Sequence, residues 1–132
     1  MGTTLVLLVD DDAAVQTMLG IELSHAGFEI VAAGDGTQAL AELESDAARF
    51  RAVVTDIRLG TGPDGWHVGR RARELVSDMP VVYMTGDSTH DWSSQGVPES
   101  VMLAKPFAPA QLVTAVSTLI TNADTHRTGP AP

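Results

Sequence analysis

The chain has 132 residues and a formal net charge of −9, with eight Lys and Arg against seventeen Asp and Glu. This length allows one compact domain with a complete hydrophobic core, and the acidic excess argues against direct binding to nucleic acid. The sequence has no cysteine, which excludes disulfides, thiolate metal sites and cysteine nucleophiles.

The composition and the start of the chain also suggest where the protein works. Hydrophobic residues make up 44% of the sequence, so we expect a folded chain rather than a disordered one. No apolar run approaches the roughly 20 residues that a membrane-spanning helix needs. Residues 1–4 lack the basic flank of a secretory signal and lead directly into a strand pattern. We therefore expect a soluble, cytoplasmic protein without a membrane partner.

In the first third of the chain, two strands are each followed by a helix. Residues 5–9 form a short, continuous apolar run, typical of a strand buried on both faces. A helix with apolar residues at helical spacing follows, and Gly27 ends it. Residues 28–33 predict a second strand. Asp35 begins the next helix, and Gln38 is placed to complete a reciprocal cap. The apolar stripe of the first helix contains Val15, Met18, Leu19, Leu23 and Ala26.

The alternation continues to the end of the chain. Residues 52–55 predict a third strand that ends at Asp56, and Asp64 begins a helix bearing Val68, Ala72 and Leu75. A fourth strand over residues 80–84 ends at Thr85, a short helix lies near residues 90–95, and a fifth strand covers residues 101–104. The last helix carries apolar residues from 112 to 120. We expect residues 122–132 to form a disordered C-terminal tail.

This order predicts an α/β fold: a five-stranded parallel sheet, doubly wound as (βα)5, with helices on both faces. We assign residues 1–121 to this one domain. In such sheets ligands bind at the carboxyl ends of the strands. The side chains at these ends are therefore the candidates for function.

Carboxylates, a threonine and a lysine come together at that edge. Asp10 and Asp11 follow the first strand, Asp56 the third, Thr85 the fourth and Lys105 the fifth. Three converging carboxylates repel one another unless a cation neutralises them, and Mg²⁺ prefers such hard oxygen ligands. Beside a metal, the carboxylate of Asp56 can attack phosphorus, while the lysine offsets the charge on the transferred group. The threonine offers a hydroxyl donor.

In these motifs the sequence resembles the receiver domain of bacterial two-component response regulators. The resemblance covers about residues 4–121 and rests on an ordered set of motifs. They are LVDDD at 8–12, VTDIRL at 54–59, DG at 64–65, MTG at 84–86 and KPF at 105–107. Each motif alone is weak, but together and in this order they are specific.

The resemblance implies a phosphorelay role. Asp56 would accept a phosphoryl group from a histidine kinase or a histidine phosphotransfer protein, and the domain would signal through contact with another protein. Asp11 would bind Mg²⁺ directly, Asp10 mainly through water, and the backbone carbonyl of Arg58 would complete the protein ligands. Lys105 would pair with the phosphoryl group, and Thr85 would move towards it. The Lys105–Pro106 bond is typically cis in relatives. Asp12 is better explained as a helix cap than as a metal ligand.

Two departures from the family pattern concern the switch. Relatives carry Tyr or Phe three residues before the lysine, whereas this chain has Met102. Either the methionine fills the same space, or the aromatic step of switching is missing and the output lies near Thr85. The segment between Thr85 and Lys105 is short and contains Pro98, so we expect a reduced fourth helix and a monomer or weak dimer.

Residues beside the site are candidates for modulating it. We predict that Arg58, Gly86 and Asp87 play this part, and our hypothesis is that Arg58 and Asp87 pair across the mouth and slow the access of water to phosphorylated Asp56. Trp66 and Trp92 are possible partner-binding anchors, with ordinary packing as the alternative.

Several alternatives stay open at this stage. The chain could be a stand-alone response regulator, which its start and polar tail favour, or a receiver taken from a larger hybrid kinase or regulator. A magnesium-dependent phosphohydrolase with an aspartyl nucleophile would need a second Asp two residues on, where this chain has Arg58. A flavodoxin-like cofactor binder would place its phosphate against three aspartates. A receiver that is not phosphorylated would not need the full set of site residues. We therefore expect self-directed phosphoryl transfer and not an enzyme acting on a separate substrate.

Overall fold

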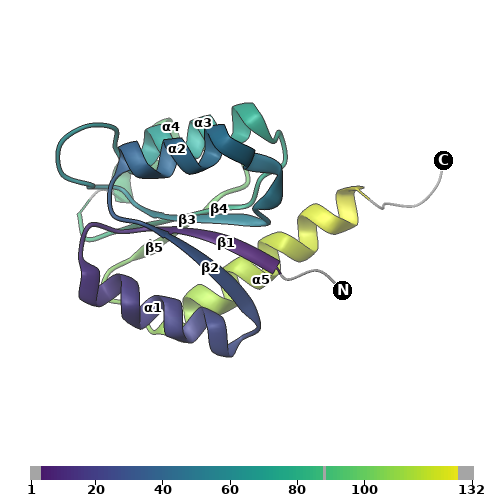
Figure 1. The fold of residues 1–132 in the computed structure, drawn as a ribbon, viewed down its shortest axis with the longest axis horizontal. Helices are drawn as coiled ribbons and strands as arrows, with labels where there is room; N and C mark the ends of the chain where they lie inside the picture. Colours follow the sequence, from purple (N-terminus) through teal and green to yellow (C-terminus); the bar gives the residue numbers. More distant parts are fainter. Residues whose placement is uncertain (1–3, 88, 128–132) are drawn as a thin grey trace.

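A computed structural model describes residues 4–87 and 89–127 of the chain. Five parallel strands form one sheet in the order β2-β1-β3-β4-β5, and helices cover both faces (Figure 1). The predicted doubly wound α/β fold is therefore confirmed. The strands are β1 Thr4–Val9, β2 Phe28–Ala33, β3 Ala52–Asp56, β4 Val81–Thr85 and β5 Val101–Ala104.

The helices lie in two layers, with α2, α3 and α4 on one face of the sheet and α1 and α5 on the other (Figure 1). Two short 3₁₀ turns, η1 and η2, accompany α2 and α4. The bounds are α1 Ala13–His25, α2 Gly36–Asp46, η1 Ala47–Arg49, α3 Gly65–Leu75, η2 Thr89–Asp91, α4 Trp92–Gln95 and α5 Pro109–Arg127. The reduced fourth helix predicted from the sequence is confirmed.

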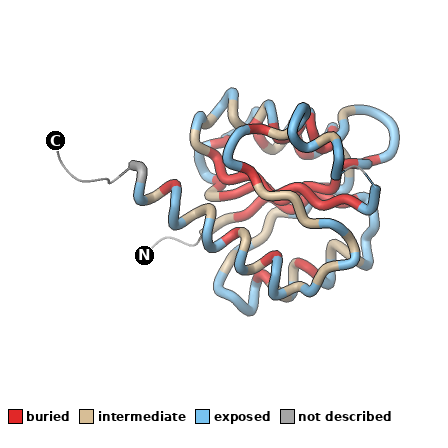
Figure 2. The backbone as a smooth tube through the Cα atoms, turned by 180° about the vertical axis from the view of Figure 1, so that it is seen from behind, coloured by how far each residue is buried: buried red, intermediate tan, exposed pale blue. Residues whose placement is uncertain are grey.

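The core has two halves because successive strand residues point to opposite faces of the sheet. Leu7, Val53 and Tyr83 belong to the half under α2 and α3, whereas Leu8 and Val54 belong to the half under α1 and α5. Every residue of β3 and β4 is buried (Figure 2). Strands covered on both faces carry continuous apolar runs, which explains the pattern seen in the sequence.

Aspartate side chains begin three of the helices. The carboxylate of Asp12 accepts hydrogen bonds from the first turn of α1, Asp35 from the amide of Gln38, and Asp64 from the amide of His67. Such caps satisfy amides that have no partner inside the helix. The capping role predicted for Asp12 is confirmed.

Two sequence expectations differ from the structure. Met18, placed on the apolar stripe of α1, is 48% exposed. The last helix also continues to Arg127, so the tail predicted from residue 122 is wrong for residues 122–127. Ala123 is buried there, and the Asp124 carboxylate lies 2.6 Å from the guanidinium of Arg51, which holds these turns to the domain. Residues 128–132 lie outside the described part.

No helix within residues 4–87 and 89–127 combines the length and the apolarity needed to cross a bilayer.

Candidate phosphorylation site

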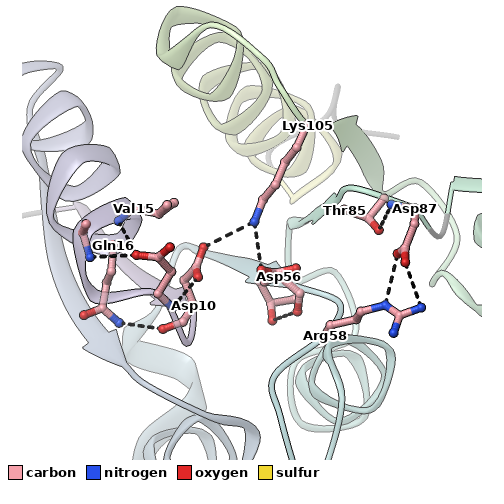
Figure 3. A network of polar contacts seen from close by, with 11 residues as sticks. Asp10, Val15, Gln16, Asp56, Arg58, Thr85, Asp87 and Lys105 are labelled. Carbon is pink, nitrogen blue, oxygen red and sulfur yellow. Dashed lines mark hydrogen bonds and ion pairs between the residues drawn. The ribbon is translucent and has the colours of Figure 1, made fainter.

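The parallel register brings the predicted strand ends to one edge of the sheet. Val9 is level with Thr55, Asp56 with Met84, and Thr85 with Ala104. The residues that follow β1 and β5 therefore meet the end of β3, and Figure 3 shows Asp10, Asp56 and Lys105 converging there.

Lys105 joins two of the carboxylates. Its Nζ lies 2.9 Å from Oδ2 of Asp56 and 3.8 Å from Oδ2 of Asp10 (Figure 3). Partial burial lowers the pKa of Lys105, but the hydrogen bond to Asp56 and the surrounding carboxylates outweigh this effect, so its pKa is raised overall. The ammonium group therefore stays charged at neutral pH beside these two aspartates.

Asp10 is the most deeply buried carboxylate of the site. It is 1% exposed, and its Oδ1 accepts a hydrogen bond of 2.9 Å from the amide of Asp12. Its Oδ2 is buried and has no hydrogen bond among the described residues. Burial raises the pKa of Asp10, and the nearby charges of Asp56 and Asp11 raise it further, although the Asp12 amide and Lys105 oppose them.

A cation would satisfy this arrangement. One carboxylate oxygen from each of Asp10, Asp11 and Asp56 lies within 4.8 Å of the other two. Asp11 is exposed and can turn towards an ion, whereas the unsatisfied oxygen of Asp10 already lies beside the site. Oxygen ligands of this kind suit Mg²⁺, which keeps several waters and needs only a few protein ligands.

The site opens into a hollow of about 430 Å³. All the residues that line this hollow were among those predicted for the site. Asp56 is 8% exposed, so its carboxylate is held by the protein and yet lies at the surface of this hollow. The Oγ1 of Thr85, from the neighbouring strand, accepts a hydrogen bond of 3.2 Å from the amide of Asp87. The lining comprises Asp11, Asp56, Arg58, Thr85, Gly86 and Asp87.

Arg58 and Asp87 pair across the mouth of the hollow, as the sequence hypothesis required. The guanidinium of Arg58 contacts both carboxylate oxygens of Asp87, at 2.8 and 3.1 Å (Figure 3). Their side chains are 76% and 54% exposed, so this pair contributes little to stability. Its effect on water access stays a prediction.

Met102 is half-buried on β5 and packs against the core half that contains Tyr83. The two residues are register partners on adjacent parallel strands, so their side chains leave the same face of the sheet. Beyond β5, the Lys105–Pro106 bond is cis, as expected from the resemblance.

Sequence reasoning missed one residue that shapes the site. The side-chain amide of Gln16, on α1, donates hydrogen bonds to the carbonyls of Asp10 and Ala33, at 3.3 and 2.9 Å (Figure 3). It ties the ends of β1 and β2 together below the acidic loop. A glutamine one turn into a helix gives no signal of such a bond, because the partner from β2 is seventeen residues away.

The two tryptophans have different surroundings. Trp66 is 6% exposed and packs on Tyr83, with ring centroids 4.7 Å apart, so it is a core residue. Trp92 is 39% exposed, and its indole N–H donates a hydrogen bond of 2.9 Å to Oγ of Ser100. Ordinary packing therefore explains Trp66.

Comparison with known protein families agrees with this geometry. Residues 6–117 match the model of the response regulator receiver domain. A response regulator receiver protein from Sinorhizobium medicae superposes with a TM-score of 0.89 at 45% identity, covering 92% of this chain and 97% of that one. The receiver domain of a sensor histidine kinase from Pseudomonas aeruginosa, solved with a magnesium ion in its active-site cleft, gives 0.77 at 26% identity, covering 91% and 99%.

Among curated proteins, the C4-dicarboxylate transport transcriptional regulatory protein DctD of Rhizobium meliloti is 34% identical over 110 residues, 82% of this chain. The phosphate regulon transcriptional regulatory protein PhoB of Pseudomonas aeruginosa is 30% identical over 129 residues, 95% of this chain. The chain spans only 23% and 53% of the lengths of these two relatives. The similarity therefore concerns one part of each longer protein.

Proposed function

Since the chain belongs to the response regulator receiver family, we propose that it accepts a phosphoryl group on Asp56 and passes the signal on by contact with another protein. A receiver domain is a two-component signalling module and not an enzyme with a separate substrate. Because the chain belongs to this family, the phosphohydrolase and the flavodoxin-like cofactor binder are no longer considered. Transcriptional control, named for the two longer relatives, is not part of the proposal.

One observation carries the proposal: Asp56 lines an open hollow, beside the ammonium group of Lys105 and close to the carboxylates of Asp10 and Asp11. Its Oδ2 is held by Lys105 at 2.9 Å, which fixes the side chain beside that ammonium group. The nearby carboxylates of Asp10 and Asp11 add negative charge that a cation would neutralise. A carboxylate in such a position can act as a nucleophile towards phosphorus.

The donor we propose is the phosphohistidine of a histidine kinase or of a histidine phosphotransfer protein. An oxygen of Asp56 forms a bond to phosphorus as the bond from phosphorus to the histidine nitrogen breaks, and the nitrogen keeps the electron pair. Lys105 then pairs with the phosphoryl oxygens, and the hydroxyl of Thr85 donates to one of them. Fixed charges of this kind provide most of the catalysis that phosphoryl transfer requires.

We propose that Mg²⁺ is held by Asp10, Asp11, Asp56 and the carbonyl of Arg58. When bound, it offsets the negative charge that builds up on the transferring group. Asp11 lies on the open side, where it can reach an ion directly, and Asp10 is set deeper. We also propose that the protein is a monomer or a weak dimer.

The experiment that tests the proposal is intact mass spectrometry after incubation with acetyl phosphate, with and without Mg²⁺. We expect the wild type to gain one phosphoryl mass only when Mg²⁺ is present. Asp56→Asn should gain none, whereas Asp12→Asn, which changes a capping aspartate of the same loop, should still be labelled. A gain in Asp56→Asn, or no gain in the wild type under any condition, would refute the assignment.

A further inference from the structure

We propose that Tyr83 couples the phosphorylation site to the α4 region through a chain of three hydrogen bonds that ends at Trp92. This inference rests on the proposed function of Asp56 and extends it to the route by which the signal leaves the site. The route uses an aromatic residue of β4, the strand that ends at Thr85, in place of an aromatic residue on β5.

The chain of bonds begins inside the core. The backbone N–H of Val97 donates to the hydroxyl oxygen of Tyr83 at 3.1 Å. The hydroxyl of Ser100 donates to the carbonyl of Val97 at 2.6 Å, and the indole N–H of Trp92 donates to the same hydroxyl oxygen at 2.9 Å. Each step joins a different part of the segment between β4 and β5. The segment is therefore bonded as a unit to one side chain of β4.

The position of Tyr83 is sterically defined. It is 0% exposed, and it is the largest fully buried side chain among the described residues. A Cβ atom added to Gly69 of α3 would collide with its hydroxyl group and ring. The ring of Trp66 packs on it from the start of the same helix. Closely packed side chains transmit small displacements instead of absorbing them, so Val97 should follow the ring.

The site end of this route is Thr85, two residues along β4. Thr85 lines the hollow above Asp56, and Asp56 and Met84 are register partners on adjacent strands. A phosphoryl group on Asp56 brings oxygens that accept hydrogen bonds from the Thr85 hydroxyl. Any shift of Thr85 towards them moves the end of β4, and Tyr83 lies on this strand.

The surface end is α4. This helix has only four residues, and the Arg70 guanidinium of α3 reaches its Gln95 side chain at 3.2 Å. Glu99, in the following turn, has a φ of 60°, a conformation that non-glycine residues rarely adopt. None of the four residues of α4 is buried, and a short, exposed helix can take two positions at low cost. Trp92, at its start, is 39% exposed and would present this change to a partner.

The position of Met102 agrees with this route. Met102 is the register partner of Tyr83 and belongs to the same half of the core. On this face of the sheet, the tyrosine ring already fills the space next to Gly69 of α3. An aromatic side chain turning inwards from β5 would meet that ring, whereas a flexible methionine can pack against it.

The test follows the indole N–H resonance of Trp92 by NMR while Mg²⁺ and beryllofluoride, a stable mimic of the phosphoryl group, are added. Trp92→Phe assigns the resonance. In the wild type we expect it to shift on addition. In Tyr83→Phe, which keeps the ring and removes the hydroxyl, the shift should fall to less than half. Ser100→Ala breaks the same chain near the surface and should have the same effect, even if Tyr83→Phe proves unstable.

Two controls separate coupling from folding and from chemistry. Met102→Leu should keep the full Trp92 response. Phosphoryl uptake from acetyl phosphate, measured by mass, should stay within about twofold of wild type in every variant, because none of these residues touches Asp56.

A full Trp92 response in both Tyr83→Phe and Ser100→Ala would overturn the coupling. If the wild type gains no phosphoryl mass, the proposed function fails first, and the coupling falls with it. If it gains the mass without a Trp92 shift, only the coupling falls.

Discussion

The carboxyl edge of the sheet and the segment of residues 89–100 are held in place by different means. At the edge, Asp56 ends β3 and Asp10 and Lys105 directly follow β1 and β5, so the sheet itself sets their positions. The segment has only η2 and the short α4, and side chains hold it to the domain, among them the hydroxyl of Tyr83 and the guanidinium of Arg70. The difference separates a chemical site that the sheet positions from a segment that, in the proposed coupling, responds to it.

The largest predicted effect concerns the chemical site. Lys105 is the only lysine in the sequence, so no other ammonium group can replace it. We expect Lys105→Met to slow phosphoryl uptake about 100-fold, the usual cost of removing one group that stabilises developing negative charge. The rate of mass gain from acetyl phosphate measures this.

Lys105→Arg is the matched variant, because it keeps the positive charge but changes the geometry. It should lie between Lys105→Met and wild type. Equal rates for wild type and Lys105→Met would mean that the contact of 2.9 Å with Asp56 has no part in the transfer.

A second prediction tests how firmly Tyr83 is held. Gly69→Ala should lower the free energy of unfolding by about 1–3 kcal/mol, because the new methyl group collides with the Tyr83 hydroxyl and ring. Gly20→Ala of α1 is the control. Its methyl would meet only ordinary contacts, with the nearest atom at 3.9 Å, so the higher helix propensity of alanine should stabilise the protein by about 0.5–1 kcal/mol.

Urea unfolding curves of the two variants decide the matter, since opposite signs are expected. In a double-mutant cycle, Tyr83→Phe should relieve part of the cost of Gly69→Ala, because the atom nearest to the new methyl is removed. If both alanine variants were more stable than wild type, the Tyr83 ring would be able to shift away from the new methyl group. The contact between α3 and β4 would then not hold Tyr83 in a fixed position.

This contrast also explains what the sequence could predict. Strand ends and their order were visible as apolar runs, so the meeting of Asp10, Asp56 and Lys105 followed from the parallel topology. The contacts of Tyr83 depend on distant residues: Gly69 lies fourteen positions before it and Val97 fourteen after it. The only hint was a tyrosine inside a buried strand, whose hydroxyl needs a partner.

The errors have a similar cause. Helical spacing placed Met18 among the buried residues of α1, but periodicity cannot tell how wide a face the sheet covers, and Met18 is 48% exposed. The polar composition of residues 122–127 suggested a tail. Contacts with the remote Arg51 and burial of Ala123 extend the helix instead.

A third prediction concerns the repulsion inside the chemical site. Because the pKa of Asp10 is raised by burial and by neighbouring charges, its ionised form opposes folding at neutral pH. In the absence of Mg²⁺, Asp10→Asn should raise the free energy of unfolding by about 1 kcal/mol, a value reduced by the attraction of Lys105. Mg²⁺ should stabilise the wild type more than the variant.

The pH dependence gives the sign of this effect. Below about pH 3.8, the ordinary pKa of an aspartate, Asp10 is protonated in the folded and the unfolded chain, so the variant should gain little. As the pH rises from there through the higher pKa of Asp10 in the folded state, the wild type should lose stability and Asp10→Asn should not. The difference in the free energy of unfolding should therefore grow with pH. Thermal unfolding in a chelator between pH 4 and 8 measures the difference. A gain that does not grow with pH would show that charge is not its cause.

The smallest predicted effect concerns the pair between Arg58 and Asp87, which line the hollow of the site. Exposed pairs of this kind contribute at most about 1 kcal/mol, so Arg58→Ala should leave the free energy of unfolding nearly unchanged. Its effect should be kinetic, because opening the mouth of the hollow lets water approach phosphorylated Asp56. We expect the phosphoryl group to be lost faster, by no more than about fivefold.

Arg49→Ala is the control for this prediction. It breaks a pair of the same length, 2.8 Å, with Glu42, remote from the hollow, and it should leave the lifetime of the phosphoryl group unchanged. Equal lifetimes in both variants would leave the Arg58 contact without a role in the switch, and a faster loss in Arg58→Ala alone would make this pair the element that sets how long the signal lasts.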